Sequence, residues 1–306
     1  MKLFAALLTV MIVLSTGQLL AQPNTTDLYM DYQKYFSEVL QLPVFQKAQT
    51  ARVAEEIRDS AVLIKEERPV AAIIPVKQRS KQLDGASIFS SRRNSVFILG
   101  KLLKRKPGAG VDFDLTGTAF AVTEDGVCAT NYHVLKELLV KGATNDSVYF
   151  VLTADKNIYF IDKILAYSQN NDVALFKVQT NGKKMIPIPF GGPAPVGTTV
   201  YCLSNPVGFF YYFSRGMVAR NIIVPAQQAA AGYNPAGKPP LRMEITADYG
   251  VGSSGGPILD QFGNMVGMVS STIPLGSPSS GAATGHQQMV VKDAIPVVAI
   301  RELLKE

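Results

Sequence analysis

The chain has 306 residues, of which 47% are hydrophobic and 18% charged, with 25 glycines, 18 prolines, no tryptophan and two cysteines. This composition excludes a disordered chain, a collagen and a small disulfide-rich scaffold, and it allows a sizeable buried core. The formal net charge is +6. Much of the excess lies in residues 77–106, whose basic clusters show neither helical striping nor interleaved aromatic residues, so we expect no nucleic-acid partner.

The amino terminus is typical of an export signal. Lys2 gives a positive start, residues 3–14 are an apolar run, and small or polar residues follow before Ala21. The run is shorter than the ~20 apolar residues that a membrane-spanning helix needs, and no cysteine follows it to accept a lipid. We predict a signal peptide of residues 1–21, with cleavage after Gly17 as the alternative. The mature protein would then be periplasmic or extracellular, with no stable membrane span.

Residues 22–90 are predicted to form a helical extension and a linker. Asp27 can cap a first helix whose apolar residues recur at helical spacing, and Pro43 interrupts it before a second helical segment. Two prolines and the polar run 78–91 then indicate a linker. The extension could dock on the rest of the chain, support an oligomer through residues 24–66, or act as an inhibitory pro-segment. Its sequence does not decide among these roles.

From about Asn94 the pattern changes to short runs rich in Val, Ile, Tyr, Phe and Thr, divided by Gly, Pro, Asn and Asp. About a dozen such runs favour a sandwich or a barrel over alternating strand and helix units. Residues 293–305 have roughly helical spacing, with Pro296 in a first turn that tolerates it, and predict a final helix. Cys128 and Cys202 lie in strand-like runs. We interpret them as two buried thiols, with one disulfide as the alternative.

The sharpest chemical signal is the segment from Gly250 to Pro257, in which glycines surround Ser254. Such glycines indicate backbone that approaches a ligand closely or adopts a positive φ, although a flexible Gly/Ser loop would also explain them. A serine becomes a nucleophile beside a base, and one of only two histidines, His133, follows a strand-like run. The base needs an orienting acceptor, and Asp172 precedes an apolar strand as a half-buried carboxylate would.

These residues lie in the motifs TNYHV, DVALFKV and GSSGGP, in the order His133, Asp172, Ser254. The arrangement resembles the trypsin/chymotrypsin-fold serine proteases and is most similar to the bacterial Deg (HtrA-type) branch. Residues 204–208 are similar to the GNPxG turn of that branch, and residues 214–218 to the SxGxV strand that follows it. Three catalytic and two structural motifs in the expected order are more specific than any one motif alone.

The resemblance covers roughly residues 94–304 and implies an all-β domain at 91–304. The domain would consist of two six-stranded antiparallel β-barrels, at about residues 91–190 and 191–292, followed by the carboxyl-terminal helix. The helical extension would precede it, and the active site would lie in the cleft between the barrels.

The resemblance also implies a role for each site residue. Ser254 would attack the scissile carbonyl, His133 would take and return the proton, and Asp172 would orient the imidazole. The backbone N–H groups of Gly252 and Ser254 would form the oxyanion hole. Ser270 matches the family serine that hydrogen-bonds the aspartate, with an ordinary strand serine as the alternative.

The specificity residues are less well defined by the sequence. Residues 269–271 would pair with an extended peptide substrate as an added strand. Asp248 lies where trypsin-like enzymes place the carboxylate that recognises Lys or Arg, although we favour a turn-capping role for it. Val269 and His286 complete the candidates for the primary specificity pocket, and for His286 an exposed loop histidine is the preferred interpretation.

The sequence therefore predicts a secreted or periplasmic serine endopeptidase that acts on protein or peptide substrates and needs no cofactor. Two departures from the family are evident: Ser253 stands where digestive proteases have the Asp used in zymogen activation, and only about 50 residues follow Ser254, too few for a PDZ domain. A metal-dependent hydrolase is disfavoured because the histidines and cysteines form no ligand cluster. The alternative is a catalytically inactive barrel that binds peptides or a protein partner.

Overall fold

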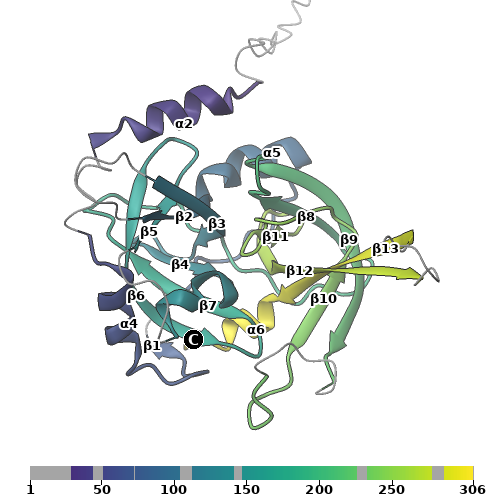
Figure 1. The fold of residues 1–306 in the computed structure, drawn as a ribbon. Coiled ribbons are helices and arrows are strands. Elements are labelled where there is room, and N and C mark those ends of the chain that lie inside the picture. The colour runs from purple at the N-terminus through teal and green to yellow at the C-terminus, as the bar shows by residue number, and fades with distance from the viewer. Residues whose placement is uncertain are drawn as a thin grey trace, which may run out of the picture.

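The computed structural model describes residues 29–43, 51–71, 73–103, 112–140, 147–225, 233–277 and 286–305. The predicted signal peptide and Asp27 lie outside this part of the chain. The described chain is mainly β-structure, with short helices around it (Figure 1). None of the described helices is both long and apolar enough to cross a bilayer.

Six antiparallel strands close into a first barrel in the order β2-β3-β4-β7-β6-β5. These strands are rich in β-branched and aromatic residues, which favour a pleated sheet, and β5 is buried along its whole length. Closure pairs both edges of the sheet, so no edge strand of the barrel is left open. The strands are β2 (Val96–Leu103), β3 (Asp112–Ala121), β4 (Val127–Thr130), β5 (Ser147–Leu152), β6 (Ile158–Ser168) and β7 (Val173–Val178).

A second closed barrel follows, with the strand order β10-β13-β12-β11-β8-β9. Its strands are again antiparallel, and the pairing of β12 with β13 is interrupted between Val269 and Ser271. The two closed six-stranded barrels confirm the predicted fold class. The strands of the second are β8 (Thr199–Ser204), β9 (Tyr212–Ile223), β10 (Leu241–Ile245), β11 (Pro257–Leu259), β12 (Met265–Ser277) and β13 (His286–Pro296).

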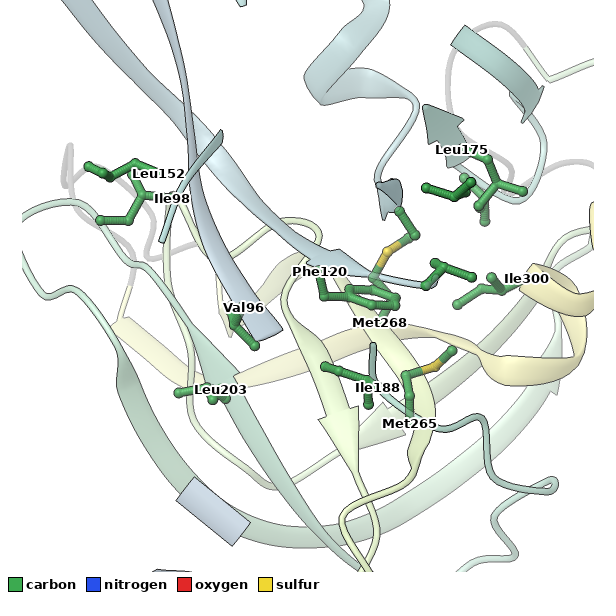
Figure 2. Close-up of a cluster of buried hydrophobic side chains, with 14 of the residues drawn as sticks. Val96, Ile98, Phe120, Leu152, Leu175, Ile188, Leu203, Met265, Met268 and Ile300 are labelled. Atoms are coloured by element: carbon green, nitrogen blue, oxygen red, sulfur yellow. The ribbon is translucent and has the colours of Figure 1, made fainter. Parts of the chain in front are cut away.

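One cluster of buried apolar side chains joins the two barrels (Figure 2). It brings Phe120 and Leu175 of the first barrel together with Leu203 and Met268 of the second, and with Ile300 of helix α6 (Val297–Arg301). Fully burying such a side chain stabilises the fold by about 1.5–3 kcal/mol. Because the barrels share this core, separating them would expose it, so residues at the seam keep a fixed mutual geometry.

The remaining elements surround the barrels. Helices α2 (Tyr32–Leu40), α4 (Ala54–Ala61) and α5 (Gly85–Arg92) precede the first barrel, and the 3-10 helix η2 (Arg93–Ser95) leads into it. The 3-10 helix η3 (His133–Leu138) follows β4. The two-residue strand β1 (Val70–Ala71) pairs in parallel with β14 (Leu304–Lys305), which ties the amino-terminal extension to the carboxyl end of the domain.

The second half of the expected linker is a helix. Residues 85–92 form α5, which begins after Asp84, whose carboxylate accepts a hydrogen bond from the Ser87 N–H at 2.7 Å. Ile88 is fully buried, and Arg92 is buried with its Nε donating to the Gly263 carbonyl at 2.7 Å. The helix is only eight residues long and buries few side chains, so its apolar pattern was too weak to identify it among polar residues.

The carboxyl-terminal helix is shorter than expected. Residues 293–296 belong to β13, where Ala294 pairs with Val269 and Ile295 with Met268. Pro296 has extended backbone (φ −70°, ψ 152°) and forms the amino-terminal cap of α6 rather than part of its first turn. The apolar spacing of this segment fits a strand followed by one helical turn as well as it fits a helix.

Helix α4 is part of the core of the first barrel. In Figure 1 it lies beside β6, and its Ala54, Ile57 and Ala61 are buried in one cluster with Phe97 of β2 and Leu135 of η3. We expect Ile57→Val, which removes one buried methyl group, to lower the free energy of unfolding by about 1 kcal/mol. Urea denaturation of the full chain followed by far-UV circular dichroism measures this. An unchanged midpoint would mean that α4 is detached from the barrel in solution.

Candidate active site

His133 and Asp172 are in direct contact at one end of the first barrel. His133 opens η3 directly after β4, and Asp172 lies in the turn between β6 and β7. The imidazole Nδ1 is 2.9 Å from Oδ2 and 3.0 Å from Oδ1 of Asp172, and the His133 backbone N–H also donates to Oδ1 at 3.0 Å. A carboxylate can only accept, so the proton of the neutral imidazole resides on Nδ1 and leaves Nε2 with a lone pair.

The environment of His133 stabilises its protonated form. Burial alone would lower the pKa of the imidazole, but the hydrogen bond to Asp172 and the charge of that carboxylate outweigh it, so the pKa lies above its ordinary value. The His133 side chain is still 48% exposed. A half-exposed imidazole beside a fixed carboxylate can take up a proton during a reaction and hold it.

The turn that carries Asp172 is held from several directions. Asp172 itself has a positive φ of 60°, which is uncommon for a residue with a side chain. Its carbonyl accepts hydrogen bonds from the Tyr132 N–H at 3.2 Å and from Asn131 Nδ2 at 3.0 Å. The buried side chains of Asn170 and Asn171 bind the backbone of residues 234–241, which precede and open β10.

Ser254 lies in a loop of the second barrel that requires glycine at two positions. Gly252 has φ +90°, and a Cβ atom there would come within 2.9 Å of the Asn205 carbonyl oxygen and the Val207 nitrogen. Gly255 has φ +88°, and its Cβ would overlap the Thr118 carbonyl oxygen. The glycines flanking the serine therefore allow both the backbone conformation and the close approach of neighbouring segments.

The backbone of this loop aims two N–H groups outward. The Val251 carbonyl accepts a hydrogen bond from the Val207 N–H at 2.9 Å, and the Ser253 carbonyl accepts one from the Gly256 N–H at 2.8 Å. In a trans peptide the N–H points opposite to the C=O, so the N–H groups of Gly252 and Ser254 face away from these inner partners. Two such donors, one of them on Ser254 itself, can stabilise a negatively charged oxygen.

Thr118 of β3 fixes the loop that carries Ser254 across the seam. Its N–H donates to the Ser254 carbonyl at 2.8 Å, and its Oγ1 donates to the Gly252 carbonyl at 3.0 Å. The same Oγ1 accepts a hydrogen bond from the Asn205 N–H. Sequence reasoning missed Thr118 because its partners lie far along the chain, whereas the Asn205 position was visible as part of the SNPVG turn.

Ser270 connects the two halves of the site. It is the unpaired residue at the break in the β12–β13 ladder, and its Oγ donates to Asp172 Oδ2 at 2.9 Å. Its carbonyl accepts a hydrogen bond from Ser254 Oγ at 3.2 Å. His133, Asp172, Ser270 and Ser254 are therefore joined in one chain of hydrogen bonds. Ser254 Oγ makes no hydrogen bond to His133 within the described chain, so a proton transfer between them requires a change in the position of at least one of the two side chains.

The structure places Asp248 in a turn rather than in an open pocket. Its Oδ1 accepts a hydrogen bond from the Tyr249 N–H at 3.1 Å and pairs with Lys292 Nζ at 2.7 Å, while its side chain is 68% exposed. Tyr249 is buried, and its single hydroxyl proton lies between two acceptors, the Asp293 carbonyl at 2.8 Å and the Ser271 carbonyl at 3.0 Å. These contacts support the turn-capping interpretation of Asp248, with its charge balanced by Lys292.

The other two specificity candidates lie apart from each other. Val269 is buried next to the loop that carries Ser254, where its carbonyl accepts a hydrogen bond from the Gly255 N–H and its N–H donates to the Gly256 carbonyl. His286 is the first residue of β13 and pairs with Ser277 at the far end of β12. The structure therefore brings Val269 to the site, whereas His286 lies several strand residues away.

A groove of about 430 Å³ runs beside His133 and Ser270 between the two barrels. Sequence reasoning did not identify its charged wall, in which Arg220 pairs with Glu244 and Arg242 with Asp293. Burial raises the pKa of Asp293 to about 6, against the opposing effect of Arg242. These charges lie on strands of the second barrel, and only the closed sheet brings them to the seam.

Both cysteines, Cys128 and Cys202, are free and buried, which confirms the preferred interpretation. Burial raises the pKa of each thiol. Within the described ranges, His, Cys, Asp and Glu side chains form no group of three that could hold a metal ion.

Residues 117–268 match the family model of the trypsin-like peptidase domain. Two antiparallel six-stranded barrels with a serine, a histidine and an aspartate at their seam define the class of chymotrypsin-like folds. Residues 117–268 therefore correspond to a trypsin-like peptidase domain, and among proteins of this fold the chain resembles the Deg (HtrA-type) proteases.

Named relatives support this resemblance. Protease Do-like 1, chloroplastic, of Arabidopsis thaliana is 27% identical over 215 residues, or 68% of this chain and 45% of that protein. Protease Do-like 5, chloroplastic, of the same plant is 28% identical over 60% of this chain and 54% of that protein. A probable periplasmic serine endoprotease DegP-like of Brucella suis is 26% identical over 60% of this chain and 32% of that protein. The chain spans about half the length, or less, of these relatives.

Solved structures agree on the fold. The crystal structure of Deg5 aligns with a TM-score of 0.50 and 22% identity, over 70% of this chain and 89% of that chain. The HtrA-type protease AlgW with a decapeptide aligns with a TM-score of 0.52 and 17% identity, over 72% of this chain and 66% of that chain.

Proposed function

We propose that the protein is an exported serine endopeptidase that hydrolyses peptide bonds through an acyl-enzyme on Ser254. The observation that carries this proposal is the single chain of hydrogen bonds that joins His133, Asp172, Ser270 and Ser254 across the seam of the two barrels. The names of the sequence relatives support the same chemistry: the plant relatives are named proteases, and the Brucella suis relative is named a probable serine endoprotease.

In the proposed mechanism, Ser254 rotates toward Nε2 of His133 and attacks the scissile carbonyl as the imidazole takes its proton. Asp172 stabilises the imidazolium, and the N–H groups of Gly252 and Ser254 stabilise the oxyanion. His133 then gives the proton to the leaving amine, and water repeats the sequence to release the acyl group.

The substrate is proposed to bind as an added strand along β12. This strand pairs with β11 only as far as Met268, so beyond Ser270 one of its edges has no strand partner in the described part of the chain. An extended peptide can use such an edge through main-chain hydrogen bonds. The structure of AlgW with a decapeptide is consistent with a peptide ligand for this fold.

A peptide-binding barrel without activity is the second candidate. It is favoured by the orientation of Ser254, whose Oγ donates to the Ser270 carbonyl instead of to His133. An extended peptide beside β12 needs main-chain acceptors for its N–H groups. It would therefore compete with Ser254 Oγ for the Ser270 carbonyl. The two candidate functions differ in one respect: in a protease, binding of a peptide frees Ser254 to reach the imidazole of His133, whereas in a binding barrel it does not.

An organophosphonate probe and an unfolded protein substrate separate the two candidates. We expect the full chain to be labelled, with the adduct mapped to Ser254 by mass spectrometry, and to cleave the substrate. Ser254→Ala should lose both properties. If neither form cleaves or is labelled while the chain still binds peptides, the binding barrel is the correct function. Labelling that persists in the variant would remove Ser254 from its role.

The oxyanion role of Gly252 predicts a loss of rate without a loss of binding. In Gly252→Ala, the new Cβ collides with the backbone of Asn205 and Val207 and turns the N–H away. We expect kcat to fall by about 100-fold or more, the usual effect of losing one oxyanion donor. Steady-state kinetics with a peptide substrate measure it, and Gly250→Ala, where the space is open, is the matched control. Equal rates in the two variants would contradict the assignment.

The labelling rate should rise with pH through the pKa of His133 and then level off, because only the neutral imidazole can act as the base. The raised pKa places the midpoint above the ordinary value of about 6.5. Because the pKa is higher in the folded state than in the unfolded state, this ion pair stabilises the fold fully at low pH. That stabilisation is lost as the pH rises through the pKa of His133. Labelling rates between about pH 5 and 9 test this, and a midpoint at or below the ordinary value would refute it.

Export through a signal peptide of residues 1–21 is part of the proposal. The periplasmic names of bacterial relatives support it, although the plant relatives are named chloroplastic. Mass spectrometry of the mature amino terminus after expression in a bacterium tests it. A terminus beginning at residue 22 or 18 is expected, and an intact Met1 would contradict it.

A further inference from the structure

The amino-terminal extension contacts both segments that carry the catalytic base and its carboxylate. Arg58 of α4 is buried, and its Nε and Nη2 donate to the Glu137 carbonyl at 3.1 and 3.0 Å. Glu137 lies near the end of η3, the helix that His133 opens. The last carbonyls of a helix lack partners within it, and a cation is the favourable group to supply one there. The guanidinium therefore fixes the end of the helix that bears His133.

A second contact of the extension holds the turn before Asp172. Glu66 Oε1 accepts a hydrogen bond from the Gln169 N–H at 2.9 Å, and Glu67 Oε1 accepts one from Ser168 Oγ at 3.1 Å. The Glu67 N–H also donates to the Tyr167 carbonyl at 2.9 Å. Three hydrogen bonds thus tie two consecutive glutamates to three consecutive residues at the end of β6.

The backbone of Glu67 gives independent support. Its φ is +58°, a conformation that a residue with a side chain adopts only when its surroundings determine it. The Ser168 hydroxyl that donates to Glu67 also accepts a hydrogen bond from the Asn171 N–H at 3.1 Å. The contact therefore reaches the residue next to Asp172 through a single buried side chain.

We propose that residues 54–68 are a positioning element of the active site, in which Arg58 holds the helix of His133 and Glu66 and Glu67 hold the turn of Asp172. The effect on catalysis rests on the proposed function, whereas the contacts that position His133 and Asp172 do not depend on it. Residues 54–68 thus have a supporting role in place of that of an inhibitory pro-segment. Losing the two glutamate contacts loosens the Asp172 turn, and with it the contact between Asp172 and His133.

The test uses the full chain with two double variants. Glu66→Ala with Glu67→Ala removes both acceptors, whereas Glu66→Gln with Glu67→Gln keeps an amide oxygen at each position. Glu124→Ala, an exposed carboxylate paired with Lys184 elsewhere on the first barrel, is the control for loss of a surface ion pair. None of these changes alters the charged groups that line the groove beside His133, which are Lys136, Asp172, Arg220, Arg242, Glu244 and Asp293.

The first measurement is the pKa of His133 by NMR. The chain has only two histidines, so His286→Gln assigns the two imidazole signals. In the alanine double variant we expect the pKa to fall toward or below the ordinary histidine value, because the Asp172 contact raises it and burial lowers it. The glutamine double variant and Glu124→Ala should keep the wild-type value. A wild-type pKa in the alanine double variant, or an equal fall in both double variants, would overturn the proposal.

The second measurement is the rate of organophosphonate labelling. We expect a loss of about tenfold or more in the alanine double variant, since misplacing a catalytic group by about 1 Å can slow a reaction by about 100-fold. The glutamine double variant should label at the wild-type rate. If the alanine double variant does not fold, Glu66→Ala alone is compared with Glu66→Gln by the same two readouts. If the wild type itself is not labelled, the proposed function fails, and the NMR comparison still decides the positioning role.

Discussion

We expect alanine at Ser254, at His133 or at both positions to lower kcat by about the same factor, roughly a million-fold. A nucleophile and its base act as a unit, so once one is lost the other has nothing left to contribute. The expectation is informative here because Ser254 Oγ donates to the Ser270 carbonyl and not to His133. If Ser254 and His133 meet only when substrate binds, they make no hydrogen bond in the unliganded structure. The effects of their two substitutions on kcat would still be fully non-additive.

The measurement is single-turnover cleavage of a peptide substrate by the two single variants and the double variant. Lys184→Ala, an exposed residue of the first barrel, serves as the control and should match the wild type. Some residual rate above the uncatalysed reaction is expected from the oxyanion donors and substrate binding. Losses that multiply in the double variant would show that Ser254 and His133 act independently, which the proposed mechanism does not allow.

The sequence predicts those site residues that are marked by their neighbours in the chain or by their rarity. Ser254 stood out because glycines surround it, and Gly252 has the positive φ that only glycine adopts readily. His133 stood out because histidine is scarce, and both it and Asp172 lie next to strand ends, where barrel residues reach the seam. The two barrels followed from short β-rich runs together with the family resemblance, and the structure confirms them.

The residues that could not be predicted act through partners far along the chain. Thr118 is an ordinary strand threonine until the second barrel brings the carbonyls of Gly252 and Ser254 to it. Glu66 and Glu67 belong to a charged run that would suit any solvated surface, and only the closed first barrel places residues 167–169 beside them. A single sequence carries no record of such pairings, whereas spacing and local propensity are visible in it.

Asp172→Asn is expected to lower kcat by about ten-thousand-fold near neutral pH while leaving the fold intact. In the wild type, Oδ1 accepts the His133 backbone N–H, and Oδ2 accepts from both Nδ1 and Ser270 Oγ. Asparagine keeps one oxygen for the backbone N–H and offers an NH₂ group at the other position. That group donates to Nδ1, so the imidazole proton moves to Nε2, where it blocks proton transfer from Ser254.

Two readouts distinguish this tautomer effect from simple disorder of the turn. The pKa of His133 should fall below its wild-type value, because the carboxylate charge and hydrogen bond that raise it are gone while burial remains. Ser270→Ala, which removes a single hydrogen bond to the same carboxylate, is the matched control and should cost about tenfold, in line with one charge-assisted hydrogen bond. Asp172→Asn within tenfold of the wild type would mean that Asp172 does not control the imidazole, and the proposed triad would lose its third member.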